Sequence, residues 1–206
     1  MNKSKLLIFD FDGTIVDSKK IYYSIISKDV SKFGYSLAYI DKEIDKGMNV
    51  SETLKDMGFP WYKRMVIEIK IMFEIMRNAR KVKKCKDVES LRFISIKKIL
   101  VSNSFSMFVD SVLRHAKIRE YFSEVYGSEH FDDKAVFIKG YLRRNRINKK
   151  ECFYIGDRAA DVKVARRAGV KSVAISNKCS WDSRQEILKE SPDFLLDSIK
   201  EIKNII

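Results

Sequence analysis

Two aspartates close to the amino terminus carry the strongest chemical signal in the sequence. Asp10 and Asp12 follow a short apolar run and are separated by Phe11. Because side chains alternate in an extended segment, the two carboxylates point to the same side of the chain. Like charges this close repel unless a cation or a shared proton lies between them, which indicates a hard metal ion such as Mg²⁺ or strongly separated pKa values. A solvated turn is the alternative, since Asp-Gly is a common turn sequence.

A second pair of aspartates, Asp157 and Asp161, lies late in the chain. Asp157 follows another apolar run, and Asp161 comes one turn into a predicted helix, so the two carboxylates face the same space. An ordinary helix cap is the alternative role for Asp157. Its position at the end of a strand, in the same crevice as Asp10, favours a metal ligand.

Short apolar runs that end in a polar residue predict the strands that position these aspartates. The runs are Lys5 to Phe9, Ile99 to Val101, Val125 to Tyr126, Phe153 to Ile155 and Val173 to Ile175. Helical patterns separate the later four runs, at Phe105 to Ala116, Lys134 to Arg146 and Arg158 to Ala168. Strands that alternate with helices predict an α/β fold, a Rossmann-like parallel sheet flanked by helices. The ligand crevice of such a sheet lies at the carboxyl ends of its strands. The polar residues at those ends are Asp10, Ser102, Gly127, Asp157 and Ser176.

The segment between the first two predicted strands is far longer than one crossover helix requires. Helical patterns within it run from Ile21 to Phe33, from Asp41 to Met57 and from Trp61 to Met76. We therefore predict a small helical domain at residues 18–85, inserted into an α/β core domain made of residues 1–17 and 86–206.

Composition and charge limit the classes of protein that this chain can belong to. Its 206 residues are 45% hydrophobic and 12% aromatic, which excludes a disordered chain. No apolar run approaches the ~20 residues that a bilayer span needs. A net charge of +13 favours anionic partners such as phosphorylated metabolites, nucleic acid or acidic lipid. Neither basic stretch, Arg77 to Lys86 or Arg143 to Lys150, interleaves aromatic residues as a base-stacking platform would.

The cysteines and the amino-terminal sequence indicate the cellular compartment. Cys85, Cys152 and Cys179 are odd in number and widely spaced. This pattern argues against a disulfide framework and a zinc site, and it predicts buried free thiols. The first apolar run meets Asp10 early and no cleavage site follows it, so we expect a cytoplasmic protein.

Taken together, these motifs resemble the haloacid dehalogenase-like hydrolases, and within them the phosphoglycolate phosphatase-like group with a helical cap. Leu7 to Ser18 is similar to the first motif of the family, Val101 to Asn103 to its second, and Gly156 to Asp161 to its fourth. The resemblance spans nearly the whole chain. Ser18 fits the first motif but is expected to position the start of the cap, with no direct chemical role.

The resemblance implies a phosphatase that hydrolyses a small phosphate monoester with Mg²⁺ as its cofactor. Asp10 would be the nucleophile that takes the phosphoryl group as an aspartyl phosphate. Asp12 would protonate the leaving oxygen and then activate water. The metal ligands would be the Asp10 carboxylate, the Asp12 main-chain carbonyl and Asp157. Asp161 would support the site through a water or by orienting a lysine.

The same resemblance requires a phosphate-binding group and a lysine. The Ser102 hydroxyl, helped by the main-chain amide of Asn103, would bind a phosphate oxygen. Lys134 is the predicted lysine, because it lies in the first turn of a helix, where a cation opposes the helix dipole unless an anionic site is near. The Lys-Pro pairing of many relatives is absent here, which leaves Lys139 as a weaker competitor.

Other functions stay open on these residues. A phosphomutase or a nucleic-acid end phosphatase would use the same fold, and a receiver domain would be a non-catalytic phosphoacceptor module. A receiver is disfavoured because Asp157 follows Ser102 and Lys134 in this chain. The expected partner is a small phosphorylated metabolite. The net charge leaves nucleic acid open without a motif for it, no membrane is expected, and the chain is predicted to be a monomer or a homodimer.

Overall fold

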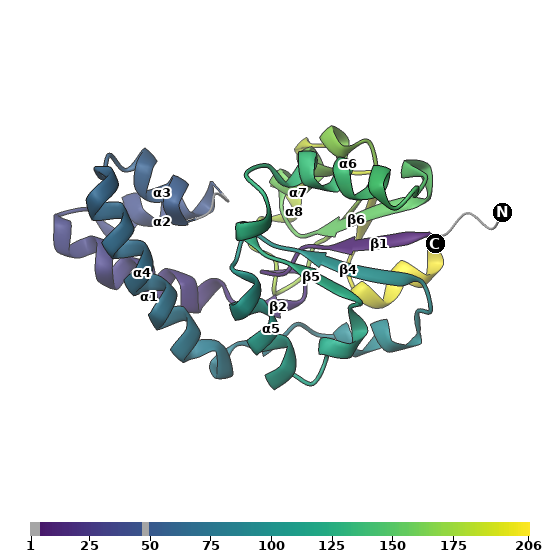
Figure 1. Cartoon of the computed structure of the whole chain (residues 1–206), viewed down its shortest axis with the longest axis horizontal. Coiled ribbons are helices and arrows are strands. Elements are labelled where there is room, and N and C mark those ends of the chain that lie inside the picture. The colour runs from purple at the N-terminus through teal and green to yellow at the C-terminus, as the bar shows by residue number, and fades with distance from the viewer. Residues whose placement is uncertain (1–4, 47–49) are drawn as a thin grey trace.

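Six parallel strands form the central sheet, in the order β5-β4-β1-β6-β7-β8 (Figure 1). The computed structural model describes residues 5–46 and 50–206. Within these ranges the strands of the sheet are β1 Leu6–Phe9, β4 Lys97–Val101, β5 Glu124–Tyr126, β6 Cys152–Gly156, β7 Lys171–Ile175 and β8 Phe194–Leu196. The central strand β1 is fully buried, as expected of a parallel strand covered on both faces. The predicted α/β fold with a parallel sheet is confirmed.

Helices cover both faces of the sheet. They are α5 Ser106–His115, α6 Lys134–Arg144, α7 Ala159–Ala168 and α8 Arg184–Lys189. Leu6 and Ile8 of β1 pack with α6 and α7 on one face. Leu7 and Phe9 face the other side, where α5 and the carboxyl-terminal segment pack (Figure 1). Short 3-10 helices lie at Ser31–Phe33, Ala79–Lys81, Val88–Phe93, Arg119–Tyr121, Ser128–His130, Lys149–Glu151 and Ile199–Asn204.

The cap lies beyond one end of the sheet, and its described residues form four helices (Figure 1). They are α1 Lys19–Val30, α2 Leu37–Asp45, α3 Val50–Asp56 and α4 Trp61–Asn78. The single helix predicted from Asp41 to Met57 is wrong, because α2 ends at Asp45 and α3 begins at Val50. Gly47, which interrupts that stretch in the sequence, lies outside the described residues.

A short antiparallel pair connects the cap to the core. It joins β2 Val16–Asp17 to β3 Lys83–Lys84, so the two ends of the insertion lie side by side. The predicted domain boundaries, at residues 18 and 85, directly follow these strands. The division itself stays a prediction that this pairing supports. No helix in the described part of the chain is long and apolar enough to cross a membrane.

The prediction of free thiols is wrong for two of the three cysteines. Cys85, directly after β3, and Cys179, in the loop after β7, form a disulfide with their Cα atoms 6.0 Å apart. The two residues are 94 positions apart in sequence, but the fold brings the cap connection and this loop together. Cys152 is buried and free, as predicted.

Candidate active site

A pocket of about 570 Å³ lies where the carboxyl ends of the central strands face the cap. Asp10, Asp12 and Lys134 line it from the core, and helices α1 and α4 line it from the cap. Crevices at the carboxyl ends of the strands are the usual ligand sites of open parallel sheets. Most of the sequence-predicted residues therefore lie on the wall of a partly open pocket large enough for a small ligand; they are Asp10, Asp12, Asn103, Lys134 and Asp161.

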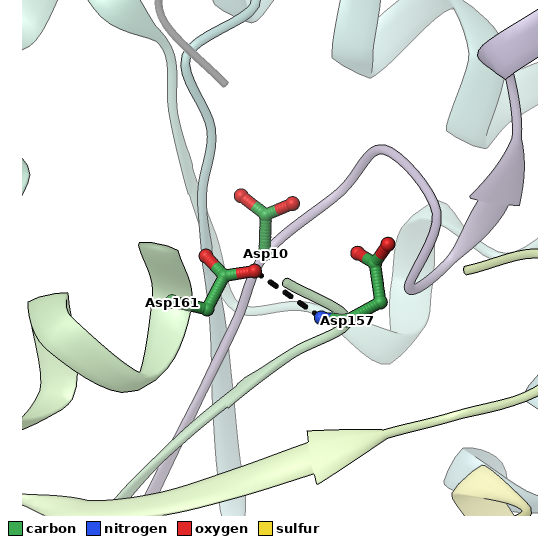
Figure 2. Close-up of side chains that lie close together, drawn as sticks. All are labelled: Asp10, Asp157 and Asp161. Atoms are coloured by element: carbon green, nitrogen blue, oxygen red, sulfur yellow. Dashed lines mark hydrogen bonds between the residues drawn. The ribbon is translucent and has the colours of Figure 1, made fainter. Parts of the chain in front are cut away.

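Three buried carboxylates converge beside this pocket. Oxygens of Asp10, Asp157 and Asp161 all lie within 4.8 Å of one another, and Figure 2 shows the side chains approaching from the ends of β1 and β6 and from α7. Burial and the negative charges of Asp161 and Asp10 hold the pKa of Asp157 well above its ordinary value. Burial and Asp10 raise the pKa of Asp161 to about 6. Three acidic side chains in such a space fit a hard divalent cation such as Mg²⁺.

The Asp161 carboxylate belongs to the same group of buried oxygens as Asp10 and Asp157. Its Oδ2 accepts hydrogen bonds from the main-chain N–H groups of Asp157 (3.2 Å) and Arg158 (3.0 Å), which fixes it at the start of α7. The other oxygen accepts from the Tyr154 hydroxyl at 3.1 Å. A Cβ on Gly156 would approach this carboxylate to 2.3 Å, so only glycine fits at the end of β6. Asp161 thus joins the two predicted carboxylate ligands in one group.

Asp157 is oriented by residues that the sequence reasoning missed. The Thr14 hydroxyl donates to its Oδ1 at 2.8 Å, and the main-chain N–H of Trp181 donates to its Oδ2 at 2.7 Å. A Cβ on Gly13, whose φ is +80°, would lie 2.2 Å from Oδ2. The Asp-Gly-Thr sequence is therefore a close-packed turn against Asp157, and the solvated turn considered from the sequence is excluded.

Lys134 forms a buried ion pair with the predicted nucleophile. Its Nζ lies 2.7 Å from Oδ1 of Asp10, and the two side chains are only 8% and 11% exposed. Burial alone would lower the pKa of Lys134, but Asp10 and Asp161 outweigh it and raise that pKa. The side chain of Asp133 accepts from the N–H of Val136 and caps α6, so Lys134 is the first residue of that helix. Lys139 is exposed on the same helix.

Asp12 lies in a hydrogen-bonded group that includes a residue of the cap. The hydroxyls of Ser18 (2.5 Å) and Ser104 (2.7 Å) donate to its two oxygens. The Tyr22 hydroxyl, on α1, lies 2.6 Å from that of Ser104. Burial nevertheless raises the pKa of Asp12 to about 6. On the sequence alone, Ser18 was expected to have no direct chemical role. Its place in the first motif was the only sequence signal for its hydrogen bond to Asp12.

The end of β4 forms the next part of the wall. Ser102 is buried, and its hydroxyl oxygen accepts a hydrogen bond from the N–H of Ser104 at 3.0 Å. Asn103 and Ser104 line the pocket itself. The predicted phosphate-binding segment therefore lies beside the aspartates, with a turn that points its next residues into the pocket.

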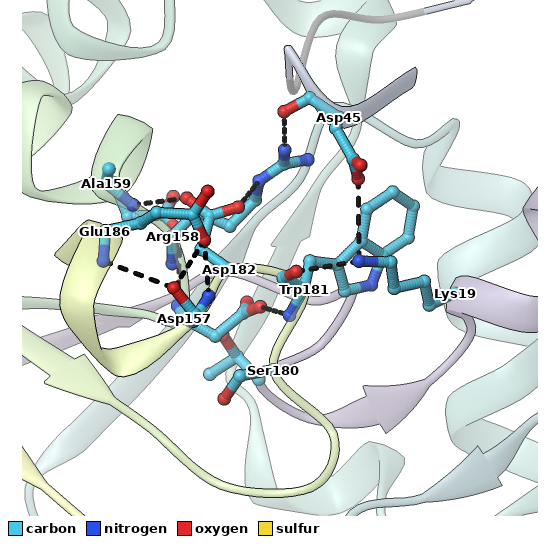
Figure 3. Close-up of polar contacts among 12 residues, drawn as sticks. Lys19, Asp45, Asp157, Arg158, Ala159, Ser180, Trp181, Asp182 and Glu186 are labelled. Atoms are coloured by element: carbon cyan, nitrogen blue, oxygen red, sulfur yellow. Dashed lines mark hydrogen bonds and ion pairs between the residues drawn. The ribbon is translucent and has the colours of Figure 1, made fainter. Parts of the chain in front are cut away.

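One loop of the core links the site to the cap (Figure 3). Arg158 forms an ion pair with Asp182 at 3.1 Å and donates to the main-chain oxygen of Asp45 at the end of α2. Lys19 of α1 donates to the main-chain oxygen of Trp181 at 2.7 Å. The same loop contains Cys179 of the disulfide. The segment that orients Asp157 is thus fastened to the cap by polar contacts and by a covalent bond.

Comparison with known proteins agrees with this geometry. The sequence model of the family described as "Haloacid dehalogenase-like hydrolase" matches residues 7–175. The chain belongs to the haloacid dehalogenase-like hydrolase family. Proteins named phosphoglycolate phosphatase from Vibrio parahaemolyticus and Synechococcus elongatus are each 23% identical to it. The first alignment covers 98% of this chain and 96% of the relative, and the second 95% and 94%.

Solved structures of this hydrolase family share the fold. A haloacid dehalogenase-like family protein from Streptococcus pneumoniae superposes with a TM-score of 0.83 at 17% identity, over 100% of this chain and 99% of that chain. A predicted phosphoglycolate phosphatase from Haemophilus somnus gives a TM-score of 0.78 at 21% identity, over the same shares. At these identities the likeness extends to the fold, cap included.

Proposed function

We propose that this chain is a magnesium-dependent phosphatase that hydrolyses a small phosphate monoester through an aspartyl phosphate on Asp10, as in the phosphoglycolate phosphatase-like group. The observation that carries the proposal is the buried ion pair of Asp10 and Lys134, which lines one pocket and lies against the carboxylates of Asp157 and Asp161. Asp12 lies beside it with a pKa suited to proton transfer near neutral pH.

In the first step, a carboxylate oxygen of Asp10 attacks the phosphorus atom of the substrate. The bond from phosphorus to the leaving oxygen breaks as the bond to Asp10 forms, and the leaving oxygen takes a proton from Asp12. A pKa of about 6 keeps a share of Asp12 protonated at neutral pH. Ser18 and Ser104 orient its carboxyl group for this transfer.

In the second step, the Asp12 carboxylate removes a proton from a water molecule that attacks the phosphorus atom. The bond from phosphorus to Asp10 then breaks, which releases inorganic phosphate and restores both aspartates. The Lys134 ammonium, already fixed beside Asp10, would stabilise the charge on the transferring group without reorganising.

The remaining residues would bind the metal and the phosphate group. Asp10, Asp157 and the main-chain carbonyl of Asp12 would hold Mg²⁺, with Asp161 in support. When bound, the ion would offset negative charge on the phosphoryl oxygens. The Ser102 hydroxyl and the Asn103 amide would donate to a phosphate oxygen.

A screen of phosphorylated metabolites with and without Mg²⁺ tests this function. We expect hydrolysis by the wild-type protein only with the metal, and none by Asp10→Asn, whose amide is nearly isosteric but is not an anionic nucleophile. Activity in excess chelator, or in a host-enzyme-free preparation of Asp10→Asn, would contradict the proposal. An aspartyl phosphate that persists for minutes would instead indicate the phosphoacceptor module.

A further inference from the structure

One face of the cap helix α4 forms a wall of the pocket. Glu68, Ile71, Met72 and Ile75 follow the spacing of a single helix face, and all four line the pocket. The other cap residues on the wall are Tyr22, Ile26, Ile44, Val50, Ser51, Glu52 and Thr53. Among the described residues, the cap therefore contributes apolar side chains, three hydroxyl side chains and two carboxylates to the pocket, but no lysine or arginine.

The cations on the core side of the pocket are already paired with carboxylates of the chain. Lys134 pairs with Asp10, as described above, and Arg158 with Asp182. Arg167, which also lines the pocket, pairs with Asp133 at 2.5 Å. A carboxylate on a leaving group would thus enter a space in which every described basic side chain has a partner, and burying an unpaired charge is costly.

Glu68 favours a positively charged group in the pocket. Its side chain is partly buried, and no described residue forms a hydrogen bond or an ion pair with its carboxylate. Aromatic residues of the core, Phe105, Phe108 and Trp181, line the same pocket. A pocket that combines a carboxylate with apolar and aromatic side chains is suited to a positively charged amine or ammonium group.

We propose that the leaving group of the substrate carries a positively charged amine and no carboxylate, and that Glu68 is the residue that selects it. This inference rests on the proposed phosphatase function and names the substrate class for the same pocket. The phosphate group would lie at Asp10 on the core side. The rest of the ester would extend toward α4, where Glu68 pairs with its cation.

Three phosphate monoesters of different charge test the inference. Phosphoethanolamine carries an amine, phosphoglycolate carries a carboxylate, and p-nitrophenyl phosphate has a neutral leaving group. We expect kcat/KM of the wild-type protein to be at least about tenfold higher for phosphoethanolamine than for phosphoglycolate. One partly screened charge interaction changes kcat/KM by about this factor.

Variants of Glu68 separate charge selection from a general loss of activity. In Glu68→Gln, the ratio of kcat/KM for phosphoethanolamine to that for p-nitrophenyl phosphate should fall about tenfold. Glu68→Lys should shift the preference toward phosphoglycolate. Glu74→Gln is the matched control, because Glu74 lies on α4 outside the pocket and pairs with Lys28, and its ratio should stay at the wild-type value.

The outcomes distinguish this inference from the proposed function. Hydrolysis of p-nitrophenyl phosphate with phosphoglycolate preferred over phosphoethanolamine would overturn the charge selection alone. Equal ratios in Glu68→Gln and Glu74→Gln would overturn the role of Glu68. Absence of Mg²⁺-dependent hydrolysis of all three esters would overturn the phosphatase function, and the inference with it.

Discussion

Replacing Lys134 by alanine should inactivate the site because it removes the positive charge that pairs with Asp10, while the rest of the pocket keeps its shape. The ammonium lies 2.7 Å from Asp10, and neither side chain is more than 11% exposed. Removing one partner of a buried pair typically costs about 3 to 5 kcal/mol, because the other charge is left uncompensated. We expect a loss of stability of this order for Lys134→Ala in a metal-free buffer.

The same substitution should lower the rate more than the affinity. A preorganised contact with the charge of the transition state is typically worth about 10²- to 10³-fold in rate. We therefore expect kcat of Lys134→Ala to fall by this factor in steady-state assays with saturating Mg²⁺. Lys134→Arg should rescue little, because a planar fork does not replace a compact ammonium in a tight site.

Lys139→Ala is the matched control, because Lys139 is exposed on the same helix. Its kcat and its urea denaturation curve should match those of the wild-type protein. A near-normal kcat for Lys134→Ala together with an inactive Lys139→Ala would refute the assignment. Equal stability of Lys134→Ala and the wild-type protein in chelator would refute the electrostatic reasoning.

Three further predictions concern pH, thiols and proton transfer. Burial raises the pKa of Asp12 and of Asp161 from 3.8 to about 6. Between these two pH values the folded protein therefore holds protons on both carboxyl groups that the unfolded chain has released. In chelator the free energy of unfolding should therefore fall between about pH 4 and pH 6, by about 3 kcal/mol for each group, and a flat urea-denaturation profile would contradict this. A thiol reagent should titrate one group, Cys152, in the unreduced unfolded chain and three after reduction, because Cys85 and Cys179 are joined. Three reactive thiols before reduction would exclude the disulfide. Asp12→Asn should release a burst of p-nitrophenolate and then turn over slowly. The good leaving group needs no proton from Asp12, but the attack of water needs Asp12 as a base. If Asp12 acted only as an acid, stopped-flow absorbance would show no burst.

Periodicity predicted the strands that carry the aspartates because a buried parallel strand is a continuous apolar run that ends at the ligand edge. The edge strand β8 was not predicted, since its residues Phe194–Leu196 are only partly buried and follow the turn-forming Pro192. The stretch from Asp41 to Met57 is helical at both ends, and Gly47 was the one sign in the sequence that it holds two separate helices.

The convergence of the aspartates could be predicted from their spacing and from the strand ends that they follow, and that of Lys134 from the family resemblance and its place at a helix start. Their supporting contacts could not. Asp157 is held by a main-chain N–H of Trp181, which almost any residue could supply, and by Thr14 from a distant segment. The contact of Tyr22 with Ser104 joins the cap to the core. Such contacts depend on the packing of the cap, which local pattern does not specify.

Phosphorylation of Asp10 can be measured directly. Wild-type protein mixed with Mg²⁺ and p-nitrophenyl phosphate, quenched rapidly in acid, digested and analysed by mass spectrometry should yield a phosphorylated peptide with the group on Asp10. The same peptide from Asp10→Asn should be unmodified. Turnover with no phosphorylated peptide at any quench time, or with the phosphoryl group on another residue, would contradict the aspartyl-phosphate mechanism.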